Sequence, residues 1–405
     1  MLGFTLNEDQ EMLAKTVKDF ATKEVEPKIA ELDEKQQFDD SILEKMKELD
    51  LLGVCIPEKY GGAGFDYVSL GLACEELEAV DTSLRVILSV HVGLNSMTML
   101  TWANEEQKQK YLAPQARGEK IATFGLTEPN AGSDVRGLQT TAKKEGDHYV
   151  LNGEKMWISL ADVADHFLIF AWTDMEKKKQ KDYKGISCFI VSRDMGIETG
   201  TIHGKLGVRA GNTGWIAMND VKVPAENMMG EEGEGFKIAM SALDNGRYTV
   251  AAGATGLVRA CRDACLKYSK ERETFGNPIG DYQLVKQMIA KMVRDYETSR
   301  LLYLKVGWMK NEGLRHTKEV SLAKWVACDA SEAASGDAVQ LHGAYGFSNE
   351  YPVERYYRNC KGAVIYEGTR EIQQLMQADY ALGNRKDGNV RKELPKYDPS
   401  EWLEE

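Results

Sequence analysis

Residues 363–373 read AVIYEGTREIQ, and the rest of the chain is interpreted outward from this stretch. A short apolar run leads into YEGT, and helical spacing begins at Arg370. Gly368 frees the backbone beside Glu367, and Thr369 can cap the helix that follows. A carboxylate with apolar neighbours is poorly solvated, so the pKa of Glu367 is expected to rise, which suits a general base. The alternative, a solvated loop residue, fits this stretch equally well.

Composition narrows the class of protein. A chain of 405 residues is too long for one ordinary core, so two or three domains are expected. The net charge of -12 argues against a nucleic-acid partner, and no apolar run is long enough to span a bilayer. The N-terminus, MLGFTLNEDQ, resembles neither a signal nor a transit peptide. We therefore expect a bacterial cytoplasmic protein, or a processed protein of the mitochondrial matrix if the source is eukaryotic.

The cysteines and histidines do not indicate a metal site. Seven scattered cysteines, an odd number, imply free thiols in a reducing compartment. Cys261 and Cys265 are four residues apart on a predicted helix, without a second ligand pair nearby. We interpret both as core residues and expect no metal.

The spacing of apolar residues predicts an α+β fold in three parts and a tail. Residues 1–122 form an N-terminal helical domain, 123–234 a central antiparallel β domain, 235–385 a C-terminal four-helix bundle, and 386–405 a polar tail, interpreted as an arm or a disordered end. Asn152-Gly153 predicts a hairpin turn between strands at 147–151 and 155–159. The long helices are expected at 236–270, 283–312, 317–342 and 370–382.

A loop at 124–134, FGLTEPNAGSD, lies where the helical part meets the β part. It combines hydroxyls, small residues and backbone amides, which is typical of a loop that binds a polar ring or a phosphate. No G-x-G-x-x-G follows a strand, and no G-x-S-x-G is present, so neither a Rossmann dinucleotide site nor a hydrolase elbow is expected.

Together with four further motifs, this loop resembles the acyl-CoA dehydrogenase family over about residues 5–385. The motifs are FGLTEPNAGSD at 124–134, KMWIS at 155–159, KERETFG at 270–276, QLHGAYGF at 340–347 and IYEGTREIQ at 365–373. The resemblance implies an FAD-dependent enzyme in which Glu367 removes a proton from the thioester Cα and flavin N5 takes a hydride from Cβ. The enolate oxygen would be stabilised by the Glu367 backbone N–H and a ribityl hydroxyl.

The resemblance also implies the FAD contacts. Thr127 would lie at the pyrimidine side of the flavin, Trp157 would cover the ring and Ser159 would approach N5. Arg272, Phe275 and residues 340–344 would hold the pyrophosphate and adenosine across a subunit interface. Without the resemblance, Trp157 would be interpreted as a core residue and Arg272 as a surface charge. The full set of expected contacts is Phe124, Leu126, Thr127, Gly132, Ser133, Trp157, Ile158, Ser159, Arg272, Phe275, Gln283, Gln340, Gly343, Ala344, Thr369 and Glu371.

Arg85 is the clue to the acyl group. It lies beside a mostly apolar helix, where a guanidinium needs a carboxylate. Glu78 or Asp81 could provide one. The other interpretation, that Arg85 binds a second carboxylate on the substrate, resembles the glutaryl-CoA dehydrogenase branch, with Glu78 on the same helical face. The expected substrate contacts are Glu78, Arg85, Ser133, Asp244, Arg247, Tyr366 and Gly368.

Within that branch the sequence leaves several substrates open. Gly93, Gly211 and Gly214 would leave room for a bulky group, which slightly favours (R)-2-benzylsuccinyl-CoA, the substrate of an anaerobic aromatic degradation enzyme. Glutaryl-CoA, with or without decarboxylation, and a short-chain acyl-CoA are the alternatives. Leu160-Ala161 departs from the small polar pair usual in the family, which affects only the finer flavin contacts.

The resemblance further implies an electron-transferring flavoprotein as acceptor and a homotetramer, a dimer of dimers. Two other functions share the fold: a non-catalytic acyl-CoA-binding scaffold, which the intact Glu367 motif argues against, and an acyl-CoA oxidase, which usually carries an additional C-terminal domain.

Overall fold

The computed structural model describes residues 5–386 and 392–403. Its N-terminal part is helical, as predicted, and α1 starts at a capping box in which Asn7 and Gln10 satisfy each other's backbone N–H groups. Ser89–Ser96 continues α5 as a wider helical turn. The α-helices of this part are α1 (Glu8–Phe20), α2 (Glu26–Lys35), α3 (Ser41–Glu48), α4 (Tyr67–Glu78), α5 (Thr82–Leu88), α6 (Met97–Trp102), α7 (Glu105–Gln107) and α8 (Ala113–Ala116).

The middle part is a mixed sheet. Along the path of neighbouring strands the order is β6-β7-β3-β2-β4-β5-β8, and β1 pairs with β4. The strands are β1 (Ala122–Gly125), β2 (Thr141–Glu145), β3 (His148–Ser159), β4 (His166–Trp172), β5 (Ile186–Ser192), β6 (Glu198–Thr201), β7 (Thr213–Pro224) and β8 (Met228–Met229). The charged loop after β4 includes a short helix, α9 (Met175–Lys179).

Two expectations about this sheet are wrong. β3 runs straight through Asn152-Gly153, which lies at an irregularity in the pairing with β7 rather than at a turn. The reversal lies instead at Gly146, between β2 and β3, where φ is +64°. The sheet is also not wholly antiparallel, because β1 runs parallel to β4. The long connection through β2 and β3 makes that parallel pairing possible.

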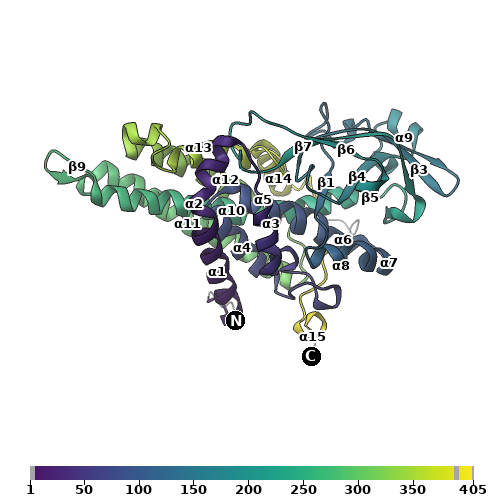
Figure 1. Cartoon of the computed structure of the whole chain (residues 1–405), viewed down its shortest axis with the longest axis horizontal. Helices are drawn as coiled ribbons and strands as arrows, with labels where there is room; N and C mark the ends of the chain where they lie inside the picture. Colours follow the sequence, from purple (N-terminus) through teal and green to yellow (C-terminus); the bar gives the residue numbers. More distant parts are fainter. Residues whose placement is uncertain (1–4, 387–391, 404–405) are drawn as a thin grey trace.

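The C-terminal part returns to helices: α10 (Gly235–Glu271), α11 (Gln283–Asn311), α12 (Thr317–His342), α13 (Val353–Ala363) and α14 (Arg370–Ala381). The sequence missed α13, which ends at Ala363, the first residue of the apolar run at 363–365. The four predicted long helices are all present as α10, α11, α12 and α14, and α13 is an additional helix among the described residues. In Figure 1 the sheet lies at one end of the molecule, and the long helices extend to the other, where β9 (Glu273–Thr274) forms the tip. The predicted helical–β–helical order is confirmed.

The tail differs from the expected arm. In its described part, Trp402 is buried on α15 (Pro399–Trp402) and meets the Tyr67 ring edge-on, with 5.4 Å between ring centroids. The Tyr67 hydroxyl donates to the Pro395 carbonyl at 2.9 Å. Residues 387–391 and 404–405 lie outside the described residues. The described tail thus packs on the N-terminal helices because it carries aromatic side chains among its polar ones.

α10 passes through the centre of the molecule and organises the site. Its residues 244–258 are all buried, with contacts to α4, α11, α12 and Ser89–Ser96. A helix that is buried on every side must offer small residues wherever other groups approach closely. Gly246 and Gly253, seven residues apart, are two such positions.

Three further observations concern membrane spans, metal ligands and cysteines among the described residues. Within residues 5–386 and 392–403, none of the helices combines the length and apolar character needed to cross a bilayer. The same residues contain no cluster of three His, Cys, Asp or Glu side chains that could hold a metal ion. Cys261 and Cys265 are buried free thiols on α10.

Candidate active site

Glu367 lies in the short turn between α13 and α14. Its backbone φ is +55°, in the left-handed region, and Gly368 follows at +89°. The left-handed conformation costs a non-glycine residue about 1–2 kcal/mol. Thr369 caps α14, as predicted, because its hydroxyl oxygen accepts from the Ile372 N–H at 3.4 Å. Further contacts must hold the strained residue.

Three side chains donate to the carbonyl groups of this turn. Lys324 Nζ donates to the Gly368 carbonyl at 2.8 Å. Gln373 Nε2 donates to the Gly368 carbonyl at 3.1 Å and to the Glu367 carbonyl at 3.4 Å. Arg247 Nε donates to the Glu367 carbonyl at 3.4 Å. The turn is therefore held from α10, α12 and α14 at once, which over-determines its strained backbone.

Glu367 as a whole is half-buried, but protein covers one oxygen of its carboxylate. Its Oε2 is buried and has no hydrogen-bond partner among the described residues. A methyl group added at Gly246 would lie 1.7 Å from Oε2, so the carboxylate rests against bare backbone of α10. Burial raises the pKa of Glu367 from its ordinary 4.5 to about 7, although Arg85, Lys324 and Arg247 each act to lower it. A carboxylate that titrates near neutrality and keeps one oxygen free can accept a proton from carbon.

A second buried carboxylate, Glu78, belongs to an ion pair with Arg85 beside the same turn. Arg85 is 1% exposed, and its Nε donates to Glu78 Oε2 at 2.6 Å. Its Nη1 donates to Ser89 Oγ at 3.1 Å, and its Nη2 donates to the Tyr366 hydroxyl. Burial alone would lower the pKa of Arg85, but Glu78, Tyr366 and Glu367 together more than offset this and raise it.

The geometry of this pair corrects two expectations. Glu78 is the last residue of α4, whereas Arg85 lies on α5, so the two do not share a helical face. They meet because the chain changes direction between the two helices. Asp81 is not the partner of Arg85: it caps α5 and pairs with Arg355 at 3.0 Å. On α10, a methyl group at Gly253 would lie 2.1 Å from Glu78 Oε2.

Asp244 and Arg247, both predicted to contact substrate, lie on α10 and pair with each other at 2.8 Å. Asp244 also accepts from the Thr317 hydroxyl at 2.7 Å. The structure thus brings Arg247 to the turn of Glu367. Ser133, by contrast, is exposed on the loop after β1.

The residues predicted to hold the flavin gather along β1, β3 and the loop between β1 and β2. The Thr127 carbonyl accepts from the Met156 N–H at 2.9 Å, and the Ser159 carbonyl accepts from the Thr123 hydroxyl at 2.6 Å. Trp157 is 59% exposed, with φ at +62°. An exposed indole held in a strained backbone fits a planar ring ligand better than a core role. Phe124, Leu126 and Ile158 lie buried behind this surface.

The residues predicted to hold the remainder of FAD lie elsewhere. Arg272 and Phe275 are at the tip beyond α10, where Phe275 is 96% exposed with φ at +53°. The other members of this group are exposed at the start of α11 and around the end of α12: Gln283, Gln340, Gly343 and Ala344. Glu371 is exposed on α14. The assignment of all these residues to FAD stays a prediction, across a subunit interface for Arg272, Phe275 and residues 340–344 and on the catalytic side for Glu371.

The prediction that three glycines leave room for a bulky acyl group is wrong. A methyl group at Gly93 would lie 3.3 Å from Thr249 Cγ2, and one at Gly211 would lie 3.3 Å from Val208 Cγ1. One at Gly214 would lie 2.4 Å from the Gly200 carbonyl oxygen. These glycines permit close packing of the protein on itself, so they do not indicate room for a bulky acyl group.

Sequence reasoning missed several residues that shape the site. Lys324, Gln373 and Gly246 hold or adjoin the Glu367 turn, although none stood out by itself. One signal was available: a lysine in the small, apolar part of α12 is unusual unless a buried acceptor compensates it.

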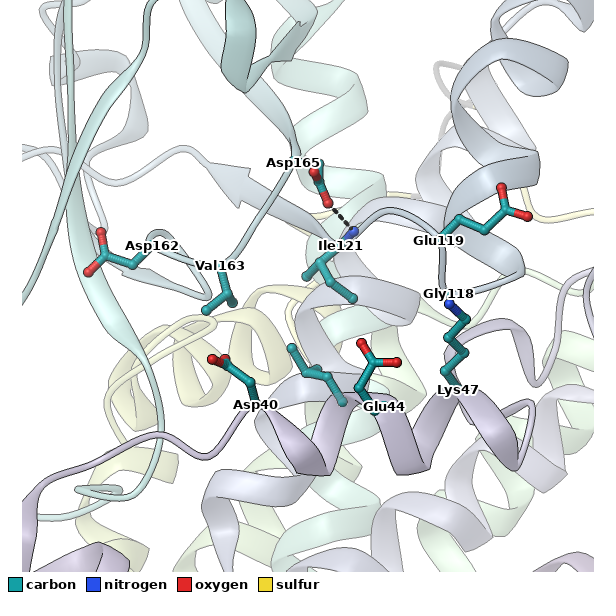
Figure 2. A pocket seen from close by; sticks show the side chains of 10 residues that line it. Asp40, Glu44, Lys47, Gly118, Glu119, Ile121, Asp162, Val163 and Asp165 are labelled. Atoms are coloured by element: carbon teal, nitrogen blue, oxygen red, sulfur yellow. Dashed lines mark hydrogen bonds between the residues drawn. The ribbon is translucent and has the colours of Figure 1, made fainter.

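A separate cavity of about 430 Å³ lies between α3 and the segments before β1 and β4. Figure 2 shows Asp40 and Glu44 on one side of it, and Asp162 and Asp165 on the other. Asp165 Oδ2 accepts from the Ile121 N–H at 2.9 Å, which ties the start of β1 to the segment before β4. The cavity shares no lining residue with the predicted site.

Comparison with known proteins places the chain among the flavin-dependent oxidoreductases that act on a CH–CH bond. Three family models match the chain: the acyl-CoA dehydrogenase N-terminal domain over residues 7–119, the middle domain over 123–221 and the C-terminal domain over 233–382. The chain belongs to the acyl-CoA dehydrogenase family. The predicted enzyme class and fold are thereby confirmed.

The named relatives include both short-chain acyl-CoA dehydrogenases and glutaryl-CoA dehydrogenases. The chain is 43% identical to a short-chain specific acyl-CoA dehydrogenase of Clostridium acetobutylicum, over 93% of this chain and 98% of the relative. It is 39% identical to a glutaryl-CoA dehydrogenase of Desulfococcus multivorans, over 95% and 99%. A solved glutaryl-CoA dehydrogenase in complex with glutaryl-CoA is 37% identical, with a TM-score of 0.90 and coverage of 97% and 99%.

Two more matches concern the cofactor and the redox partner. A solved acyl-CoA dehydrogenase of Bacillus anthracis, described as complexed with FAD, is 34% identical over 94% of this chain and 68% of its own, with a TM-score of 0.86. A caffeyl-CoA reductase–Etf complex subunit of Acetobacterium woodii is 40% identical, over 91% of this chain and 97% of the relative.

Proposed function

We propose that this acyl-CoA dehydrogenase oxidises a dicarboxylic acyl-CoA thioester to its α,β-unsaturated product. Glu367 removes the Cα proton, and Arg85 binds the distal carboxylate of the substrate. FAD, when bound, supplies the acceptor for the Cβ hydride. Arg247 and Asp244 hold the thioester side of the substrate near the base.

The state of Glu367 supports its role. Its free Oε2, its burial and its pKa of about 7 are what proton abstraction from carbon at neutral pH requires. The Glu367 backbone N–H, positioned by the fixed turn, serves the developing enolate oxygen.

The observation that carries the dicarboxylic substrate is the buried guanidinium of Arg85 next to Glu367. Among the described residues, its contacts with Glu78, Ser89 and Tyr366 use three of its five N–H groups. One N–H on each Nη is left for a ligand, which is the pair that a carboxylate binds bidentately. The competing interpretation is that Glu78 already satisfies Arg85 and that the substrate is an ordinary short-chain acyl-CoA.

Two dicarboxylic substrates remain candidates. (R)-2-Benzylsuccinyl-CoA has the second carboxylate that Arg85 would bind. Its bulk is no longer favoured, because Gly93, Gly211 and Gly214 pack closely against protein. Glutaryl-CoA, with or without decarboxylation, fits the same requirement and is the substrate named for two of the relatives above.

We further propose that an electron-transferring flavoprotein reoxidises the flavin, as the Etf-associated relative suggests, and that the enzyme is a homotetramer, a dimer of dimers. The exposed cluster around Phe275 and Gln340 would then complete FAD sites across subunits. A bacterial cytoplasmic location, or the mitochondrial matrix for a processed eukaryotic protein, stays part of this proposal.

Anaerobic bleaching of the flavin by butyryl-CoA, glutaryl-CoA and (R)-2-benzylsuccinyl-CoA tests the substrate. We expect only the dicarboxylic thioesters to bleach wild type, and Glu78→Gln/Arg85→Gln to lose that preference while keeping the buried site neutral. Asp81→Asn/Arg355→Gln, which neutralises another buried ion pair, is the matched control and should keep the preference. Equal bleaching by butyryl-CoA in wild type and the double variant would show that Arg85 only pairs with Glu78 and does not bind the substrate.

The same experiment separates the enzyme from its alternatives. A scaffold would not bleach with any thioester. An oxidase would bleach and then reoxidise rapidly in air, whereas a dehydrogenase reoxidises slowly because its closed site excludes oxygen.

A further inference from the structure

Lys324, a buried lysine on α12, has no part in the reaction proposed above. Its neighbours on the helix, Ala323, Ala327 and Cys328, are all buried. Its Nζ donates to the Gly368 carbonyl at 2.8 Å. An ammonium group in such surroundings is costly unless a hydrogen bond and an opposite charge compensate it.

The opposite charge that it faces is the base itself. Burial lowers the pKa of Lys324, and Cys328 and Glu367 act to raise it. Reciprocally, Lys324 acts to lower the pKa of Glu367. The two groups are thus coupled, although the hydrogen bond of Lys324 goes to the backbone carbonyl and not to the carboxylate.

Lys324 differs from the two other cations that face Glu367. Arg85 is paired with Glu78 at 2.6 Å, and Arg247 is paired with Asp244 at 2.8 Å. Among the residues that the structure describes, Lys324 forms no ion pair with a carboxylate. Lys324 thus acts on the base without a carboxylate partner of its own in the described structure, although Arg85 lowers the pKa of Glu367 more strongly.

We propose that Lys324 is a positioning residue for the catalytic base: its hydrogen bond to Gly368 holds Glu367 in its left-handed conformation, and its charge favours the ionised form of the Glu367 carboxylate. This inference rests on the proposed role of Glu367. The titratable and charged groups that bear on this pair, by element, are Cys74 and Glu78 on α4, Arg85 on α5, Asp244 and Arg247 on α10, Lys324 and Cys328 on α12, Tyr366 in the turn, and Glu371 on α14, which interacts with Lys324.

Two substitutions separate the hydrogen bond from the charge. Lys324→Gln keeps a donor for the Gly368 carbonyl but removes the charge, whereas Lys324→Met removes both. In the FAD-loaded enzyme, the pH profile of anaerobic flavin bleaching should shift to higher pH in Lys324→Gln, raising the apparent pKa by about 1. Its plateau at high pH should equal that of wild type. In Lys324→Met the profile should shift equally and the plateau should also fall, because the turn is no longer held.

A second readout does not depend on turnover. Infrared titration of the protonated carboxyl band, with Glu367→Gln as the subtraction reference, follows the base directly. The midpoint should rise in Lys324→Gln and stay unchanged in Lys310→Gln, which alters another buried lysine that bonds Asn245 on α10.

If the neutral variants do not fold, the infrared midpoint of Glu367 can still be measured in Lys324→Arg. It retains both charge and donor, so the midpoint should stay at or below that of wild type. A raised midpoint in Lys324→Arg, or a Lys324→Gln profile that overlays wild type, would overturn the proposal. Failure of the base assignment gives a different result: Glu367→Gln would then bleach at the wild-type rate.

Discussion

Two carboxylates, Glu367 and Glu78, each place a covered oxygen against the same helix, yet the structure leaves them in opposite states. Gly246 of α10 faces the first and Gly253, seven residues later, faces the second. Glu78 accepts from Arg85 and from the Thr82 hydroxyl, so both of its oxygens are bonded. Glu367 keeps Oε2 without a partner in the described structure. Burial alone therefore does not make a base; burial without a direct partner does.

The largest effect is expected from Glu367→Gln, which tests whether Glu367, and not Glu78, is the base. The amide cannot accept the Cα proton, so flavin reduction by substrate should slow by about 10³-fold or more. FAD should stay bound, because the turn keeps its backbone contacts. Stopped-flow bleaching and the flavin absorbance of the purified variant measure both. Substantial reduction by the variant would show that another group takes the proton.

The other side of the comparison is tested by Arg85→Met. It leaves the Glu78 carboxylate buried without its counter-ion, which should lower the free energy of unfolding by about 3–5 kcal/mol. Glu78→Gln/Arg85→Met should recover most of that loss. Denaturant unfolding of both proteins is the measurement. If the double variant is no more stable than the single one, the pair is not the source of the effect.

The two glycines of α10 give a matched pair of substitutions. Gly246→Ala pushes on Glu367 Oε2 and should slow flavin reduction by about 10²-fold, since a displacement of about 1 Å at a reacting group costs that much. Gly253→Ala pushes on Glu78 instead and should mainly reduce thermal stability. Parallel bleaching and melting curves compare them. Equal effects of both variants on the bleaching rate would contradict the division of roles.

The smallest expected effect is a change of kcat/KM and of stability with pH. The protonated base is inactive, so kcat/KM should fall about tenfold for each pH unit below the pKa of about 7 and level off above it. Because the folded-state pKa of Glu367 is raised above 4.5, its contribution to stability is present below pH 4.5 and is lost as pH rises to about 7. Steady-state profiles and urea unfolding across this range check the two trends. A kcat/KM that stays flat down to pH 5 would exclude Glu367 as the titrating group.

Much of the fold could be predicted because its signals are local. The long apolar periodicity of α10, α11 and α12 predicted their bounds to within a few residues, and Thr369 capped α14 as expected. Asn152-Gly153 misled because a turn dipeptide also fits an irregularity inside a long strand, and only the pairing of β3 with β7 distinguishes the two. α13 was missed because its charged and aromatic residues hide a short helix.

The sequence by itself determined the family and the order of helical and β parts, and it predicted Glu367 as the base, because these depend on motifs and on spacing along the chain. The tertiary structure decided which partner Arg85 takes, which carboxylate stays free and which residues hold the Glu367 turn. Those outcomes depend on contacts between α4, α5, α10, α12 and the turn after α13, which lie far apart in the sequence. The pKa of a buried group follows the charges that surround it in space, and no local pattern records them.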